Sequence, residues 1–118
     1  MRVYRIDGQE SSWERLGQAI NGDNAYDDFG WCVNLSPDGN TIAIGFPEIG
    51  GYDGYGGGQG YVRVFSLEVG DDDVDTGSWK QIDQDIIGEA NGDEFGYSGT
   101  FSDDGKTLAV SAISNDPL

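Results

Sequence analysis

The sequence contains an internal repeat with an offset of 66 residues, from Trp13 to Trp79. Residues 13–50 align with residues 79–116 without a gap, and identical residues recur along this length. The identical pairs include Ile20 with Ile86, Gly22 with Gly88, Phe29-Gly30 with Phe95-Gly96, Ser36 with Ser102, and Asp38-Gly39 with Asp104-Gly105. Self-similarity at a fixed period indicates a repeat architecture, in which each unit is a supersecondary structure that packs against its neighbours.

Each unit is predicted to contain four β-strands. Apolar and small or polar residues alternate over 29–35, which is the two-residue rhythm of a half-buried strand. Turn-forming residues at 37–40 then precede the apolar run 42–46, so these segments predict a hairpin. The segments 61–65 and 79–82 are rich in β-branched and aromatic residues and are predicted to be the third and fourth strands.

The order of these strands defines the expected domain organisation. If the strands of a unit are named A to D, the chain reads C-D-A-B-C-D-A-B, because residues 2–4 match 63–65 and a second A strand spans 95–101. We therefore expect residues 1–118 to form part of one domain, with units at 13–78 and 79–118. The second unit is incomplete, and residues 1–12 end a preceding unit.

One local signal predicts a helix instead. The residues Ser11 to Glu14 fit a helix capping box, so one or two helical turns could follow Trp13. The matched segment at 77–81 lacks the acidic partner of that box. Because repeated units share their secondary structure, a strand is the favoured interpretation at both positions.

Composition and charge limit the possible functions. Twenty glycines and only three prolines suit many short strands joined by turns. The formal net charge of −16 disfavours binding to nucleic acid or to an anionic membrane surface. A chain without histidine cannot itself supply a Ser-His-Asp triad or a histidine metal site. The acidic excess fits either surface solubility or attraction of calcium or a cationic partner.

Two known families share short motifs with this chain. Residues 35–45 resemble the A-B hairpin of WD-repeat blades, and 61–65 resemble the third strand of such a blade. A closer similarity is to FG-GAP repeats of the integrin α-subunit kind, through Phe29-Gly30 and Gly45-Phe46-Pro47. This resemblance implies an all-β fold of four-stranded β-propeller blades, with about two blades present.

The FG-GAP resemblance also bears on calcium and on localisation. Members of that family often hold calcium in the A-B loop through several acidic side chains. Here that loop offers Asp38 with Asn40 in one unit and Asp103 with Asp104 in the other, which is fewer carboxylates than that site requires. The resemblance favours a secreted or cell-surface protein, although residues 1–20 show no signal-peptide pattern.

Three acidic or aromatic groups are candidate binding residues. Acidic pairs precede both A strands and could form a negative rim, or could simply be solvated; they are Asp27, Asp28, Asp93 and Glu94. A glycine-rich loop carries the candidate ligand-binding residues Tyr52, Asp53 and Tyr55. An insertion carries the candidate metal ligands Asp71, Asp72, Asp73 and Asp75, which a solvated loop would explain equally.

These features favour a non-catalytic β-propeller module for interaction or scaffolding, with no cofactor. Such a module would be a fragment or subunit of a larger propeller or complex, and its partners would be a protein, other blades or copies of itself. Two alternatives stay open: a calcium-dependent adhesion-type propeller, and an enzyme whose carboxylates converge from missing blades. Copied carboxylates favour architecture over catalysis, since a catalytic residue should break the repeat.

Overall fold

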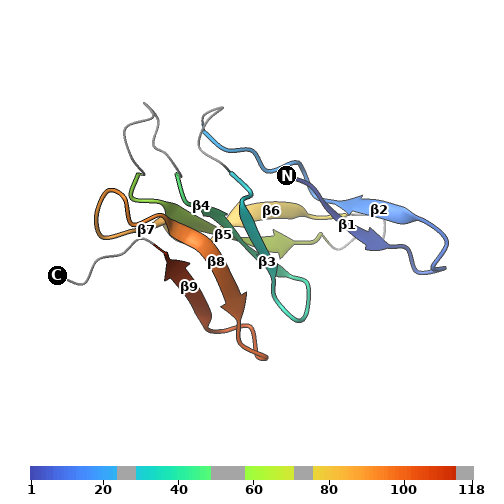
Figure 1. Ribbon diagram of the computed structural model, residues 1–118. Coiled ribbons are helices and arrows are strands. Elements are labelled where there is room, and N and C mark those ends of the chain that lie inside the picture. Colours follow the sequence, from blue (N-terminus) through green and yellow to red (C-terminus); the bar gives the residue numbers. More distant parts are fainter. Residues whose placement is uncertain (24–28, 49–57, 71–75, 114–118) are drawn as a thin grey trace.

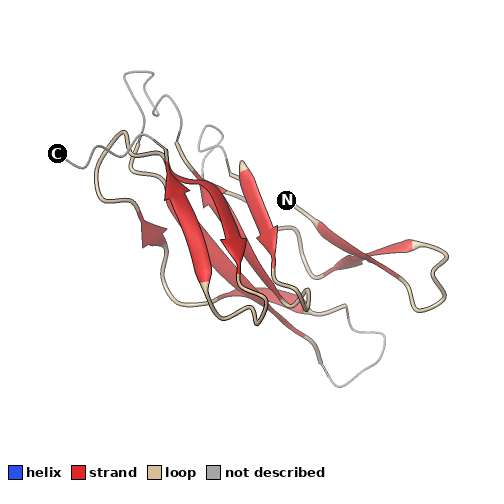
Figure 2. Ribbon diagram, turned by 60° about the horizontal axis from the view of Figure 1, so that its bottom comes forward, coloured by secondary structure: helices blue, strands red, loops and turns tan. Residues whose placement is uncertain are grey.

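The structure is a computed structural model that describes residues 1–23, 29–48, 58–70 and 76–113 (Figure 1). Within these ranges the ordered elements are all β-strands, and no helix is present (Figure 2). The expected all-β class is therefore confirmed, and the helix suggested by the capping box at Ser11 is wrong. No helix long enough and apolar enough to cross a bilayer occurs in the described part of the chain.

The strands follow the predicted order, with one addition. They are β1 (Val3–Ile6), β2 (Trp13–Leu16), β3 (Cys32–Leu35), β4 (Thr41–Phe46), β5 (Tyr61–Glu68), β6 (Ser78–Gln81), β7 (Ile86–Ile87), β8 (Phe95–Phe101) and β9 (Leu108–Ala112). The sequence did not predict β7, a two-residue strand that pairs with the start of β5. Its brevity explains this, because two residues carry no detectable periodicity.

These strands form three antiparallel sheets. The central sheet runs β3-β4-β5-β6 as a meander, and β7 also pairs with β5. A ribbon of β1 and β2 extends from one end of the molecule, and the β8–β9 hairpin lies toward the other (Figure 1). The central sheet thus joins strands A, B and C of the predicted unit 13–78 to strand D at the start of the next one. From here on, a unit means one such A-B-C-D sheet, so the ribbon is the C-D half of a preceding unit and the β8–β9 hairpin is the A-B half of a following one.

Matched strands pair in the same register in both copies of the repeat. Ile6 opposite Trp13 in β1–β2 corresponds to Leu67 opposite Trp79 in β5–β6. Val33 opposite Ile44 in β3–β4 likewise corresponds to Gly99 opposite Val110 in β8–β9. Because side chains alternate between the two faces of a strand, equal register directs equivalent residues to equivalent faces.

The hydrophobic core lies between the β1–β2 ribbon and the central sheet. The buried cluster joins residues of both, namely Val3, Leu16, Ile20, Ile42, Ile44, Phe46 and Trp79. A reciprocal pair of hydrogen bonds between Met1 and Ile20 closes the ribbon, at 2.7 Å from the amino terminus and 2.9 Å from the Ile20 amide. The core is therefore an interface between successive units rather than the interior of one unit.

Trp79 lies at the centre of this interface. We use the name Trp79 joint for the contact of Trp79 with four residues at and after the end of β2, namely Leu16, Gly17, Gln18 and Ile20. The Trp79 indole is 2% exposed, and Nε1 donates to the Leu16 carbonyl at 2.9 Å. The Gln18 amide accepts from the Trp79 backbone N–H at 2.9 Å and donates to its carbonyl at 2.7 Å. The joint combines a buried aromatic ring with satisfied polar groups.

Trp13, the counterpart of Trp79, is 71% exposed. It stands in the same register on its ribbon, but no preceding unit lies against it in the described structure. Two other pairs of matched residues differ in the same way. Leu16 and Ile20 are each 6% exposed, whereas their counterparts Ile82 and Ile86 are 45% and 46% exposed. Equivalent residues thus differ in burial only because their neighbouring unit differs.

The face of β3 shows the same dependence on a neighbour. The alternation in 29–35 predicted a half-buried strand, but β3 begins only at Cys32, and Val33 and Leu35 are exposed. The opposite face carries Cys32 and Asn34 and packs against β8. Just before β3, Trp31 contacts its own counterpart Tyr97, with ring centroids 5.6 Å apart. Val33 and Leu35 lie opposite Ile44 and Ile42, so the exposed face of β3 is the face on which β4 packs against the ribbon.

The overall shape agrees with units placed side by side. The molecule measures 52 × 30 × 25 Å, and its radius of gyration is 15.8 Å. A compact domain of this length would have a radius of gyration of roughly 13 to 14 Å. The chain therefore buries less surface than a closed domain would, and apolar side chains stay exposed at both ends.

We predict that Trp79→Ala lowers the free energy of unfolding by about 3–5 kcal/mol, because it removes a buried indole and its hydrogen bond. Trp13→Ala is the matched control and should change the free energy of unfolding by less than about 0.5 kcal/mol, because that ring is exposed. Urea denaturation followed by circular dichroism, at low protein concentration, measures both. Equal losses in the two variants would show that the joint does not carry the fold.

Candidate functional site

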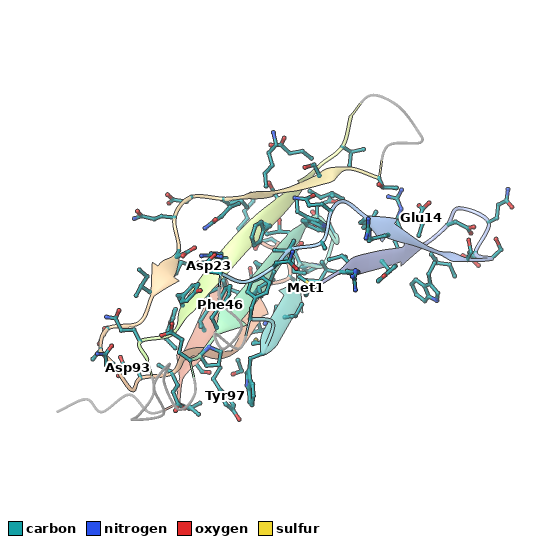
Figure 3. The ribbon with its side chains drawn as sticks, turned by 90° about the horizontal axis from the view of Figure 1, so that it is seen from above. Met1, Glu14, Asp23, Phe46, Asp93 and Tyr97 are labelled. Carbon is teal, nitrogen blue, oxygen red and sulfur yellow. The ribbon has the colours of Figure 1, made fainter. Side chains whose placement is uncertain are left out.

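The two described residues of the predicted acidic rim have different roles. Asp93 is 5% exposed, and its Oδ2 accepts from the Ala90 amide at 2.9 Å (Figure 3). The Asp93 amide in turn donates to the Ala90 carbonyl at 3.2 Å. The Asp93 carboxylate therefore closes the turn before β8, a role that its position in the sequence did not reveal. Glu94 follows with a φ of 56° and is only partly buried.

The other predicted binding residues lie outside the described part of the chain. These are Asp27 and Asp28 of the rim, Tyr52, Asp53 and Tyr55 of the glycine-rich loop, and Asp71, Asp72, Asp73 and Asp75 of the insertion. Their predicted roles stay predictions. Within the described residues, no three His, Cys, Asp or Glu side chains lie close enough together to hold a metal ion.

The A-B turns use their aspartates to hold the backbone. In the first turn Asp38 accepts from the Ser36 hydroxyl at 2.7 Å and from the Asn40 amide at 2.9 Å. In the second turn Asp104 accepts from the Ser102 hydroxyl at 2.7 Å and from the Lys106 amide at 3.0 Å. Each of these carboxylates has an oxygen that already accepts two hydrogen bonds, so the repeated Asp-Gly pair is explained by turn geometry.

These hydrogen bonds stabilise the ionised carboxylates. The Asn40 amide and then the Ser36 hydroxyl lower the pKa of Asp38 from its usual 3.8. For Asp104 the Ser102 hydroxyl is the first cause of a lowered pKa and the Lys106 amide the second. Asp7 shows the same effect in the β1–β2 turn, where the Ser11 amide and the Ser12 hydroxyl lower its pKa to about 2.

Arg63 forms the main charged cluster of the described structure. Its guanidinium contacts Asp23 at 2.6 Å and Asp85 at 2.9 Å. It also lies 5.1 Å from the ring centroid of Phe46 and 5.2 Å from that of Tyr61, within the range of cation–π contacts. The bond from Arg63 lowers the pKa of Asp23, and the bond to Asp23 raises the pKa of Arg63.

The Arg63 cluster connects successive units, as the Trp79 joint does. Asp23 follows β2 in the preceding ribbon, whereas Asp85 follows β6 of the central sheet. Figure 3 shows Asp23 and Phe46 close together at the centre of the molecule. Sequence reasoning did not identify this cluster. The signal that could have found it is the match of Arg2 with Arg63, a repeated basic residue in a chain with only six.

Among the hollows between the central sheet and the β8–β9 hairpin, two are large. One has a volume of about 310 Å³, and its lining includes Ile82, Gln84 and Ile86. The other has a volume of about 440 Å³, and its lining includes Glu89, Asp93 and Ala112. We call the first the β6–β9 hollow. Three of its lining residues are the repeat counterparts of Leu16, Gln18 and Ile20 in the Trp79 joint.

By the repeat alignment, the β6–β9 hollow corresponds in position to the site that the Trp79 ring occupies in the Trp79 joint. Leu108, the counterpart of the buried Ile42, lines the same hollow and is only partly buried. The larger hollow has a similar origin, because Ala112 stands where the first copy has the bulky Phe46. The larger hollow is lined by the carboxylates of Glu89 and Asp93, and the Asp93 carboxylate already accepts a hydrogen bond from the Ala90 amide.

Comparison with known proteins gives no further assignment. No family model matches the chain, and no curated protein or solved structure matches it either.

We predict that Ser102→Ala raises the pKa of Asp104, and Ser36→Ala that of Asp38, toward 3.8, because each removes a donor to an ionised carboxylate. A lowered folded pKa stabilises the protein fully above the unfolded pKa, and that stability is lost as the pH falls below 3.8 through the folded value. Carboxyl carbon chemical shifts, titrated from about pH 6 to about pH 2, measure the pKa values.

Asp7 is the internal control for this titration, since its donors lie in a different turn. Its pKa should stay at about 2 in both serine variants. If the pKa of Asp38 and Asp104 did not move in the variants, the serine hydroxyls would not be donors to these carboxylates.

Proposed function

We propose that this chain is a non-catalytic interaction and scaffold module built from β-propeller-type repeat units. The observation that carries the proposal is the Trp79 joint, in which one unit is completed by the unit before it. A module of this kind acts through the contacts between its units and the surfaces they present. Repeat proteins that stack in this way serve widely as binding surfaces.

The carboxylates support a scaffold more than an enzyme. Asp38, Asp93 and Asp104 each accept hydrogen bonds from the backbone of their own turn. The repeated carboxylates therefore have structural partners already. An active site built from them would first have to give up the bonds that shape these turns.

The calcium-dependent alternative is the second candidate, and it rests on the acidic insertion at 71–75 together with the FG-GAP resemblance. In that alternative, calcium would raise the unfolding midpoint well above the value in a chelator. The scaffold proposal requires no such shift at matched ionic strength. The two can therefore be separated during the experiment described next.

The experiment lengthens the chain by one half-unit. Residues 1–113 are followed by a second copy of residues 48–82, which supplies strands C and D and a second copy of Trp79. If the units are of propeller type, the added tryptophan fills the β6–β9 hollow beside Ile82 and Ile86. The control has alanine in place of the added tryptophan and is otherwise the same.

We expect the lengthened chain to unfold with a free energy about 3–5 kcal/mol higher than that of its alanine control, the value of a buried large aromatic residue. Urea denaturation in a chelator measures the difference, and repetition with calcium tests the alternative. Indole fluorescence should shift to shorter wavelength as the added ring is buried. Equal stability of the two lengthened chains would contradict the proposal, because the hollow would then not be a unit joint.

A further inference from the structure

We propose that the β6–β9 hollow binds Trp13 of a second copy of this chain, so that copies associate head to tail. This inference rests on the proposed function, since it treats the Trp79 joint as the template for a second joint. The β8–β9 hairpin of one copy and the β1–β2 ribbon of the next would then form one four-stranded unit. The occupant is identified by the residues that the chain itself exposes.

The hollow has the side chains needed to receive an indole. In the Trp79 joint, Leu16 and Ile20 belong to the same buried cluster as the ring, and the Gln18 amide hydrogen-bonds both the N–H and the carbonyl of Trp79. The corresponding residues Ile82, Gln84 and Ile86 all line the β6–β9 hollow. With a volume of about 310 Å³ the hollow is large enough for a tryptophan side chain.

The ribbon has the side chain needed to fill it. Trp13 is 71% exposed and lies opposite Ile6 in the register that places Trp79 opposite Leu67. The ribbon therefore presents the same surface as β5 and β6. An indole exposed to this extent is a typical anchor of a protein interface.

The strand edges match as well. Within the described residues β9 pairs only with β8, and β1 pairs only with β2, so each has an edge available for pairing. The register between β4 and β5 places Ala43 opposite Val64. Applied to the two copies, it places Ala109 of one opposite Val3 of the other, in a continuous β8-β9-β1-β2 sheet.

Charge complementarity supports the same alignment. Arg63 pairs with Asp23 of the preceding ribbon, and the counterparts of these residues are Arg2 and Glu89. Both counterparts are exposed, and neither forms an ion pair within the described structure. In the proposed assembly, Arg2 of one copy lies next to Glu89 of the other.

The second joint should be weaker than the first. At Gly17 an added Cβ would lie 2.7 Å from the Trp79 ring, and the corresponding residue is Asp83, with a φ of 60°. An indole in the β6–β9 hollow must therefore shift to avoid the Asp83 side chain. Ser111 likewise stands where the first copy has Gly45, at which an added Cβ would clash with the Gly96 carbonyl. We therefore expect reversible association.

The proposed interface is heterologous, because it joins two different surfaces of the chain. Such an interface continues from copy to copy and gives either a closed ring or an open filament. This property allows a complementation experiment. Trp13→Ala removes the indole but keeps the hollow, and Ile86→Glu blocks the hollow but keeps the indole. Both residues are exposed, so each variant should fold as the parent does.

Sedimentation velocity of the full chain, from about 1 µM to about 500 µM, tests the proposal. We expect the parent to form larger species as the concentration rises and each variant alone to stay at the 12.7 kDa of one chain. An equimolar mixture of the two variants should form a dimer and nothing larger. Val69→Ala, which changes an exposed side chain elsewhere, should associate as the parent does.

Two further variants test the details of the contact. Asp83→Gly should tighten association at least threefold, because it removes the side chain that crowds the indole. Arg2→Glu should weaken association, and adding Glu89→Arg should restore it. A restored association would not be expected from nonspecific aggregation.

A monomeric parent throughout this range, or unchanged association of Trp13→Ala, would overturn the proposal. A stabilised lengthened chain with a monomeric parent would retain the repeat scaffold and reject only the second copy as occupant. If the lengthened chain were not stabilised and the parent stayed monomeric, both the proposed function and the association of copies through the β6–β9 hollow would be rejected.

Discussion

The buried indole of Trp79 is the interaction on which the rest of the structure depends. A buried indole N–H needs an acceptor, and the acceptor here is a carbonyl of the preceding ribbon, at Leu16. The ring also needs space, which Gly17 provides by having no side chain. The Gln18 side-chain amide then forms two hydrogen bonds with the Trp79 backbone at the outer edge of β6, in the way that a neighbouring strand would. These contacts fix the ribbon against the central sheet and thereby complete the core.

This dependence on a neighbour explains the uneven burial along the chain. A single four-stranded sheet has two faces, and each face needs cover from an adjacent unit. Where the neighbour is present, as at Leu16 and Trp79, the apolar residues are almost fully buried. Where it is absent, as at Trp13 and Ile82, residues of the same type remain exposed. Burial here follows position in the series of units more than residue type.

The repeat explains why so much of the fold could be predicted. It fixed which segments pair, and the A-B turns follow from Ser36-Pro37-Asp38-Gly39 and its copy, whose hydrogen bonds are local. Burial could not be predicted in the same way. Trp13 and Trp79 have equivalent sequence positions, and only the presence of a neighbouring unit distinguishes them. The turn role of Asp93 and the ion pairs of Arg63 were missed because both depend on backbone and side-chain geometry that composition does not encode.

The acidic composition of the chain makes ion pairs important at the contacts between units. A chain with a net charge of −16 repels its own copies at long range, and short-range contacts must overcome this repulsion. Neutralising pairs therefore matter most where units meet, and Arg63 with Asp23 is such a pair. Arg2 is the corresponding residue on the exposed end of the ribbon. A basic residue repeated at the joint of an acidic chain both favours the correct register and penalises contacts that leave two acidic surfaces facing each other.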